Sequence, residues 1–338
     1  MKYQRVVVTR YGGPEVLQVV EGDLPKPRAG EARVKIVTAG VSAYDVMLRQ
    51  SGLLPGSPRV PFTPGVDVVG VVDKLGEGVS TVELGQTVAG STFSLGGVGG
   101  YAEYVCLPAG ELVPVPAGVD PAKAVCLVAN YLTAHMTMHR TAKIRSGERV
   151  LIHGAAGGLG TALLDLGKLA GLEMYGTASG YNHDLVSALG ATPIDYHTED
   201  FCARIHSLTG DGVDAVFDPI GGAGHLWRSY RALRHGGRLL WFGAAATKRK
   251  GLRVIPLSLL MVFLLKLIPD GKQAPLAQDI SKDNAWYRET LAELLDLLAA
   301  GKVKPVVAEC FPLVEAVRAH ERLDRGRYAG KMVLVTGA

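Results

Sequence analysis

The sequence has few cysteines, and they are dispersed. Its 338 residues include four of them, none in a CxxC pair: Cys106, Cys126, Cys202 and Cys310. Disulfide-rich secreted domains and structural zinc lobes both need clustered cysteines. We therefore expect reduced cysteines in a cytoplasmic protein, and no structural zinc.

Long hydrophobic runs are also missing. The N-terminal residues 1–8 lack the apolar stretch of a secretory signal and suggest a first strand. The longest apolar run, 257–268, carries Lys266 and falls short of the roughly 20 residues that a transmembrane helix needs. We prefer a buried or pocket-lining helix there to a membrane contact. Surface attachment through this run stays open as an alternative.

Strong charge of either sign is absent. The 36 basic and 32 acidic residues give a net charge of +4, and the excess is spread along the chain. A nucleic-acid-binding protein typically concentrates basic residues in a stripe, so we expect no nucleic-acid partner. Hydrophobic residues make up 48% and charged residues 20%, values typical of a folded chain of about two domains.

The two parts of the chain differ in their secondary-structure pattern. Short β-prone runs separated by Gly and Pro fill the first 120 residues and are typical of a β-barrel domain: 1–8, 32–38, 66–74, 86–89 and 101–105. From residue 148 onward, strands alternate with helices. The strands are 149–152, 173–177, 193–195, 213–217 and 238–242, and the helices between them are 159–170, 183–189 and 199–208. This alternation predicts an α/β fold with a doubly wound parallel sheet, the Rossmann arrangement.

Three further regions complete the expected secondary structure. Residues 121–140 look helical, with a break near Asn130. A helix follows at 287–300. Two late strands, 304–307 and 331–335, flank a helix near 313–323.

A glycine-rich turn follows the strand 149–152. It reads Gly154-Ala155-Ala156-Gly157-Gly158-Leu159-Gly160 and opens the next helix. Small residues there allow backbone amides to approach a pyrophosphate, and the helix dipole favours the anion. Ala155 stands where the common fingerprint has Gly. The strand–turn–helix context predicts a dinucleotide site.

No acidic residue follows the second strand of this region. NAD-specific sites usually place one there to bind the ribose hydroxyls. Here residues 176–183 contain none, and Ser179 is available to donate to a 2′-phosphate. His183 could add positive charge, or could simply be an exposed residue in the first turn of a helix. The pattern favours NADP.

Together these segments resemble the zeta-crystallin-like quinone oxidoreductases, a zinc-free branch of the medium-chain dehydrogenase/reductase superfamily. The resemblance runs nearly end to end. It rests on the glycine loop and on segments 40–45, 61–67, 99–104, 132–134, 212–218, 236–238, 242–243 and 330–335.

The resemblance implies a division into two domains. A discontinuous GroES-like β-barrel catalytic domain would comprise 1–124 and 270–338, and a Rossmann domain that binds NADPH would comprise 125–269. The implied cofactor contacts are Thr133, Ala156, Gly157, Gly158, Leu159, Ser179, His183, Tyr196, Phe242, Gly243, Ala244 and Lys331. Family members often carry Lys where His183 stands.

The zinc alcohol dehydrogenases share this fold. By the resemblance, their catalytic zinc needs a Cys and a His where this chain has Ser42 and Val66. Neither residue is a good Zn²⁺ ligand, so we expect no metal.

Hydride transfer without zinc requires an acceptor that is already electrophilic, such as a quinone or a conjugated enone. Ser42 and Tyr44 are the candidate catalytic donors to its oxygen. Tyr44 could equally pack in the core, and we expect Asp45 to cap the helix 46–50. We expect His153 to be packed and neutral.

Two other functions stay open, and one oligomeric assembly is expected. The chain could reduce an enoyl or alkenal double bond, or it could be a vesicle- or crystallin-like binding protein that retains its cofactor site. A homodimer is expected through the cofactor sheet, with 252–255 as its edge strand, because pairing satisfies an exposed edge.

Overall fold

A computed structural model of the chain describes residues 2–52, 57–243, 245, 247, 253–275 and 283–337. The chain divides into two compact units. Unit 1 comprises Met1–Leu132 and Ile280–Ala338, and unit 2 comprises Thr133–Asp279. The C-terminal segment therefore returns to the N-terminal unit, as the resemblance implies.

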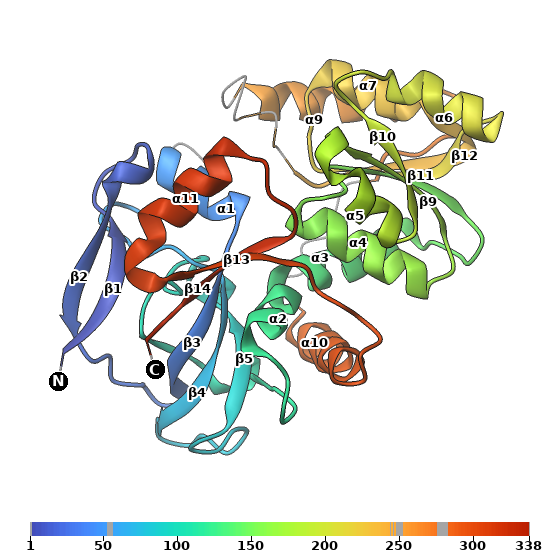
Figure 1. The fold of residues 1–338 in the computed structure, drawn as a ribbon. Coiled ribbons are helices and arrows are strands. Elements are labelled where there is room, and N and C mark those ends of the chain that lie inside the picture. Colours follow the sequence, from blue (N-terminus) through green and yellow to red (C-terminus); the bar gives the residue numbers. More distant parts are fainter. Residues whose placement is uncertain are drawn as a thin grey trace. The chain divides into compact units, whose positions relative to one another are not determined.

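Unit 1 is built around a seven-stranded sheet in the order β13-β14-β3-β4-β5-β7, with β6 also paired to β3. Its strands are β3 (Glu31–Val41), β4 (Asp67–Leu75), β5 (Thr87–Ser91), β6 (Tyr104–Pro108), β7 (Val113–Pro114), β13 (Val307–Pro312) and β14 (Lys331–Val335). A separate antiparallel pair, β1 (Lys2–Val8) and β2 (Leu17–Asp23), packs into the same core. In Figure 1 the red β14 lies beside the blue β3, to which it pairs antiparallel.

The helices of unit 1 are α1 (Ala43–Gln50), α2 (Pro121–Cys126), α10 (Asn284–Ala299) and α11 (Ala316–Arg325). The predicted break near Asn130 is confirmed, since Leu127–Tyr131 is π-helical before α3 (Leu132–His135). The predicted strand at 304–307 is misplaced. The strand begins at Val307, where its pairing with Lys331 begins.

Unit 2 contains a parallel sheet in the order β10-β9-β8-β11-β12. Its strands are β8 (Arg149–His153), β9 (Glu173–Ala178), β10 (Ala191–Asp195), β11 (Val213–Asp218) and β12 (Leu233–Trp241). Its helices are α4 (Gly158–Leu169), α5 (His183–Ala188), α6 (Phe201–Thr209), α7 (Ala223–Arg231) and α9 (Val254–Leu265). Figure 1 shows α4 and α5 on one side of these strands and α6, α7 and α9 on the other.

This strand order confirms the doubly wound sheet. The chain first runs outward from β8 to β10, then crosses back to β11, so β8 and β11 are neighbours at the point where the direction reverses. In such folds ligands bind beyond the carboxyl ends of the strands at this switch point. His153 ends β8 and Asp218 ends β11.

Two expectations about the region after β12 are wrong. The predicted edge strand at 252–255 is not formed, because α9 begins at Val254; Leu252 lies outside the described residues. Instead Gln273 pairs with Arg238 of β12. The predicted burial of 257–268 also fails for half of the run, where six large apolar side chains are exposed: Leu257, Leu259, Leu260, Phe263, Leu264 and Leu267.

Among the helices described, none has the length and apolar character needed to cross a membrane.

Candidate functional site

The glycine loop joins β8 to α4 in tight backbone contact. Gly154 has φ +63°, a left-handed conformation that favours glycine. A Cβ on Gly160 would lie 2.2 Å from the carbonyl oxygen of Gly154, so no larger residue fits there. Gly157 has more room, since a Cβ there would lie 3.3 Å from the same oxygen.

The N-terminus of α4 is suited to an anion. Gly157 is its N-cap and provides no side chain to cap the first-turn amides. Gly158 and Leu159, which begin the helix, are partly exposed, whereas Ala156 before them is buried. The helix has 12 residues, and its dipole adds to the attraction for a phosphate. The loop therefore fits a dinucleotide pyrophosphate.

Three polar side chains gather beyond β9. Ser179 is buried, and its Oγ lies 2.8 Å from Tyr196 Oη and 3.3 Å from His197 Nε2. Tyr196 is half exposed, so its hydroxyl faces a solvent-accessible surface. His197 is a further member of this group that the sequence pattern did not predict, and its position next to Tyr196 is the signal that could have identified it. Asp195 positions it by accepting a hydrogen bond from the His197 amide.

His183 begins α5, four residues after Ser179. Its Nε2 is buried and has no hydrogen-bond partner among the described residues.

The loop after β12 rests on the loop after β11. The Phe242 amide donates to the Asp218 carbonyl at 3.2 Å. Gly243 packs so closely that a Cβ would lie 2.5 Å from the carbonyl oxygen of Pro219. Ala244 lies outside the described residues. Thr133, at the start of unit 2, is partly buried, and its carbonyl accepts a hydrogen bond from Thr137.

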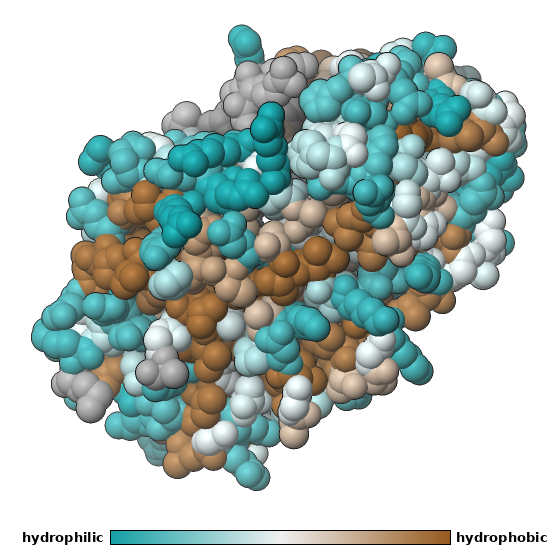
Figure 2. All heavy atoms as spheres, viewed as in Figure 1, coloured by the Kyte–Doolittle hydropathy of each residue, from teal (hydrophilic) through white to brown (hydrophobic). Residues whose placement is uncertain are grey.

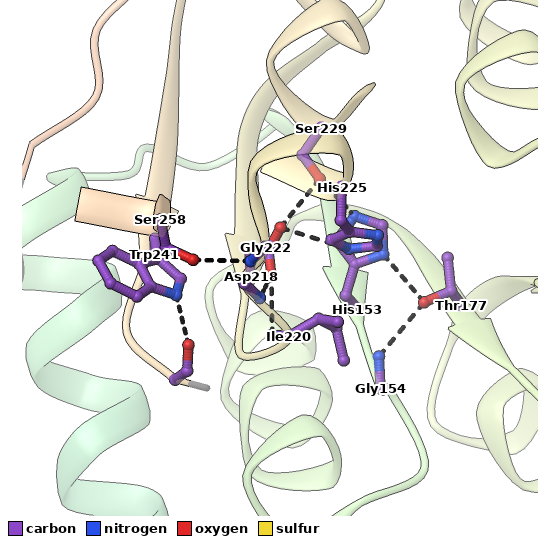
Figure 3. Close-up of polar contacts among 12 residues, drawn as sticks. His153, Gly154, Thr177, Asp218, Ile220, Gly222, His225, Ser229, Trp241 and Ser258 are labelled. Carbon is purple, nitrogen blue, oxygen red and sulfur yellow. Dashed lines mark hydrogen bonds and ion pairs between the residues drawn. The ribbon is translucent and has the colours of Figure 1, made fainter. Parts of the chain in front are cut away.

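A chain of hydrogen bonds crosses the switch point (Figure 3). Gly154 N donates to Thr177 Oγ1 at 3.2 Å, which lies 3.0 Å from His153 Nδ1. His153 Nε2 lies 3.1 Å from Ser229 Oγ, which donates to Asp218 Oδ2 at 2.9 Å. The chain links the first residue of the glycine loop to the end of β11.

The chain fixes the tautomer of His153. Ser229 has one proton and gives it to the carboxylate, so it must accept from His153 Nε2. Burial lowers the pKa of His153 to about 3, so the ring is neutral and Nδ1 accepts from Thr177. The expectation of a packed, neutral His153 is confirmed.

His225 brings a second imidazole to the same place. Its Nε2 lies 3.4 Å from Asp218 Oδ2, and one ligand atom from each of His153, Asp218 and His225 falls within 4.8 Å of the others. The sequence spacing gave no sign of this group. Both ring nitrogens of His153 are engaged by Thr177 and Ser229, so a metal would have to break the hydrogen-bond chain. We interpret the group as part of that chain.

In unit 1, Ser42 and Asp45 form a capping box at the start of α1. Ser42 is the N-cap, and Asp45 lies in the first turn, which corrects the expectation that Asp45 is the cap. Asp45 Oδ2 accepts from Ser42 N at 2.8 Å and from Ser42 Oγ at 2.6 Å, while Oδ1 accepts from Gly65 N at 3.0 Å. The single Ser42 proton is thus donated to Asp45, which leaves Ser42 without one for a substrate.

Burial dominates the electrostatics of Asp45. It raises the pKa of this carboxyl to about 6, against the opposing hydrogen bonds from Ser42. Tyr44 is only half buried and lies edge-on to Phe93, with ring centroids 6.2 Å apart. Burial raises the pKa of its phenol, so Tyr44 keeps its proton and can donate it in a hydrogen bond.

Lys331 forms a buried ion pair with Asp67. Burial alone would lower the pKa of Lys331, but Asp67 outweighs that effect and raises it. The ammonium expected to contact the cofactor is therefore engaged by Asp67, the residue after Val66.

Unit 1 also has a hollow of about 630 Å³ lined by residues of β3, β4, β13 and β14 and by the residues after β14. Its wall includes Ile36, Val71 and Phe311 and none of the expected site residues. Figure 2 shows apolar side chains gathered over this part of unit 1.

Two family models match the chain. One, described as "Alcohol dehydrogenase GroES-like domain", matches residues 28–117, and one described as "Zinc-binding dehydrogenase" matches residues 189–334. The chain is similar over its length to curated proteins. It is 31% identical to the synaptic vesicle membrane protein VAT-1 homolog of Danio rerio, covering 99% of this chain and 70% of that protein. It is 30% identical to the quinone oxidoreductase of Sus scrofa, and the match covers 97% of this chain and 96% of that protein.

Solved structures agree. The quinone oxidoreductase of Escherichia coli complexed with NADPH superposes with a TM-score of 0.87 at 26% identity, covering 98% of this chain and 99% of that one. The mycobacterial protein Rv1454c complexed with NADPH gives a TM-score of 0.86 at 28% identity, with the same coverage. The two-unit fold, the glycine loop and the full-length identity agree, and the resemblance inferred from the sequence is confirmed. The chain belongs to the quinone oxidoreductases of the medium-chain dehydrogenase/reductase superfamily.

Proposed function

We propose that this oxidoreductase transfers hydride from NADPH to a quinone or another conjugated carbonyl, without a metal. The observation that carries the proposal is the group of Ser179, Tyr196 and His197 beyond β9. A hydroxyl, a phenol and an imidazole suit a phosphate, and no acid follows β9 to repel it. The NADPH complexes of two relatives support the same cofactor.

We assign the remaining cofactor contacts within unit 2. The uncapped amides of α4, at Gly158 and Leu159, would hold the pyrophosphate. Thr133, Phe242, Gly243 and Ala244 would border the nicotinamide half, as the resemblance implies. His183 stays a secondary candidate for the 2′-phosphate. When bound, the cofactor supplies the hydride.

Tyr44 is our candidate for the donor to the acceptor's oxygen. Its phenol holds its proton and is partly exposed. Ser42 acts through Asp45, since its proton is donated there and the capping box fixes the start of α1 on which Tyr44 stands. We expect this site to work by positioning and hydrogen bonding, because water can protonate the product oxyanion.

We further propose a cytoplasmic homodimer formed through the cofactor sheet. Gln273 adds the next parallel position beside β12, with Leu239 N donating to Gln273 O at 2.8 Å. Among the described residues no further strand pairs beyond Gln273, and an edge of this kind can pair with its twin. Light scattering at micromolar concentration should give a dimer, and a stable monomer would contradict this assembly.

The function is tested by steady-state oxidation of NADPH with quinones and enones side by side. We expect turnover with quinones. Turnover with enones alone would make the chain a double-bond reductase, and no turnover with either would favour a binding role.

The cofactor preference is tested by fluorescence titration of NADPH and NADH. Ser179→Ala should weaken NADPH binding about tenfold and leave NADH nearly unchanged, as expected for one hydrogen bond to a charged phosphate. Ser187→Ala, an exposed serine on α5, is the matched control. Equal losses for both cofactors would contradict the assignment of Ser179.

A further inference from the structure

Helix α9 is apolar along its length, yet only one face of it is buried. Val254, Ser258, Val262 and Leu265 are buried, and they recur at the spacing of a single helix face. Val262 and Leu265 join the core of unit 2, and Ser258 Oγ accepts from Gly222 N at 2.7 Å. The helix is thus attached to unit 2 by this face.

The opposite face exposes large apolar side chains. Six of them have exposed fractions between 46% and 64%: Leu257, Leu259, Leu260, Phe263 and Leu264 on α9, and Leu267 in the turn that follows it. At 3.6 residues per turn they occupy a single arc of about 160°. Singly exposed leucines are common, but a contiguous apolar face of this kind marks a surface that another molecule covers.

The stretch of sequence that contains this face has positive charges only. Between Thr247 and Ile268 the sequence has five basic and no acidic residues: Lys248, Arg249, Lys250, Arg253 and Lys266. The whole chain has a net charge of only +4, so this segment is more basic than the chain as a whole. Arg253 and Lys266 are exposed at the two ends of α9. An apolar helix face flanked by basic residues is typical of helices that lie in an anionic membrane surface.

A second copy of the chain fits the exposed face of α9 less well than an anionic membrane does. A two-fold contact through α9 would bring Arg253 and Lys266 of both copies to one interface, and like charges repel. An anionic bilayer supplies both the apolar interior and the opposite charge.

We propose that α9 docks the protein on an anionic phospholipid bilayer, with its exposed leucines and Phe263 in the headgroup–acyl boundary. Its 12 residues span about 18 Å, enough to lie in the surface plane. The benefit rests on the proposed function, because apolar quinones partition into lipid and docking would place the enzyme beside its acceptor. This revises the expectation that the run avoids membranes.

Vesicle flotation of the full chain tests this. We expect at least tenfold more binding to vesicles of phosphatidylcholine with phosphatidylserine than to phosphatidylcholine alone, and we expect this binding to fall as salt rises. The double variant Leu260→Asp/Phe263→Asp should lose the binding. Leu84→Asp, at an exposed leucine of unit 1, should keep it.

Two results would overturn the proposal. One is no binding of the unaltered chain to anionic vesicles, and the other is equal binding by the double variant and the Leu84→Asp control. A double variant that instead changes a dimer to a monomer in light scattering, with no lipid binding by either form, would assign the face to a second copy. NADPH oxidation with a water-soluble quinone should be the same in all three proteins. Failure of that assay in the unaltered chain would contradict the proposed function and leave the docking result intact.

Discussion

The two units differ in the polar groups that they bury: unit 1 buries a pair of opposite charges, and unit 2 buries a neutral chain of hydrogen bonds. In unit 1, Asp67 and Lys331 form a full charge pair beside the buried Asp45. In unit 2, the chain from Thr177 through His153 to Ser229 is neutral and ends at Asp218. Unit 1 therefore depends on keeping both charges, since a lone buried charge is very costly. Unit 2 depends on one imidazole staying uncharged in one tautomer.

By the resemblance, zinc enzymes of this fold bind their metal at the positions of Ser42 and Val66. In this chain Asp67 follows Val66 directly, and its buried carboxylate is balanced by the ammonium of Lys331. A cation from the chain itself thus offsets the acidic residues of this region.

The largest expected effect is the loss of the charge pair. Lys331→Met should lower the free energy of unfolding by about 3–5 kcal/mol, because it leaves the Asp67 carboxylate buried and unpaired. Urea denaturation measures it.

The control is the double variant Lys331→Met/Asp67→Leu, which removes both charges. It should recover most of the lost stability. If the double variant is as unstable as Lys331→Met alone, packing around the lysine stem matters and the charge pair does not.

The neutral His153 of unit 2 predicts that folding stability depends on pH. Its pKa is about 3 in the folded chain and about 6.5 when unfolded, so the unfolded chain binds more protons between these values. Stability should therefore fall as pH drops from 6.5 toward 3, by about 4 kcal/mol in total. His153→Gln should flatten this slope in urea denaturation at a series of pH values. An unchanged slope would mean that His153 is not the group responsible.

Asp45 of unit 1 predicts that folding stability changes with pH in the opposite direction. Its pKa rises from 3.8 to about 6 on folding, so the folded chain binds more protons between these values. Stability should fall as pH rises through this window, by about 3 kcal/mol. Asp45→Asn should remove that slope while leaving the one from His153. Slopes of the same sign at both residues would contradict the contrast between the units.

Two glycines of the loop are expected to have different roles: Gly160 is needed for packing, and Gly157 faces the ligand. Gly160→Ala should cost about 2 kcal/mol, because its Cβ would meet the Gly154 carbonyl. Gly157→Ala should fold normally, so any loss of NADPH binding in it reports on the pyrophosphate. Thermal unfolding and cofactor titration of both variants measure this. Equal destabilisation would mean that the two positions are equally confined.

The smallest effect is expected at Tyr44. Tyr44→Phe should lower kcat/KM for a quinone by about tenfold, roughly 1.4 kcal/mol, since solvent can replace one neutral donor. Steady-state kinetics with NADPH bound normally measure it. A complete loss of turnover would make Tyr44 an indispensable acid.

The sequence was most informative where a pattern is local. The glycine loop and the alternation of strands and helices follow from period and spacing, and both are present. The return of residues 331–335 to the N-terminal unit, which the resemblance implies, is present too. Ser179 and Tyr196 are 17 residues apart and meet as expected, because β9 and β10 are adjacent parallel strands.

Contacts that depend on the tertiary fold could not be predicted from local sequence patterns. Lys331 and Asp67 are 264 residues apart, and His153 and Ser229 are 76 apart. The order of the strands brings Lys331 to Asp67, and the packing of α7 on the sheet brings Ser229 to His153. Residues 252–255 look like a short strand in isolation, but the apolar run that follows makes Val254 the first residue of a helix.

The most direct test of the central claim is NADPH oxidation by a quinone after exhaustive dialysis against a chelator. The account predicts an unchanged rate and no zinc in elemental analysis, because Ser42 and Val66 are not good ligands and His153 is held in its hydrogen-bond chain. Activity that disappears on dialysis and returns with zinc would contradict it.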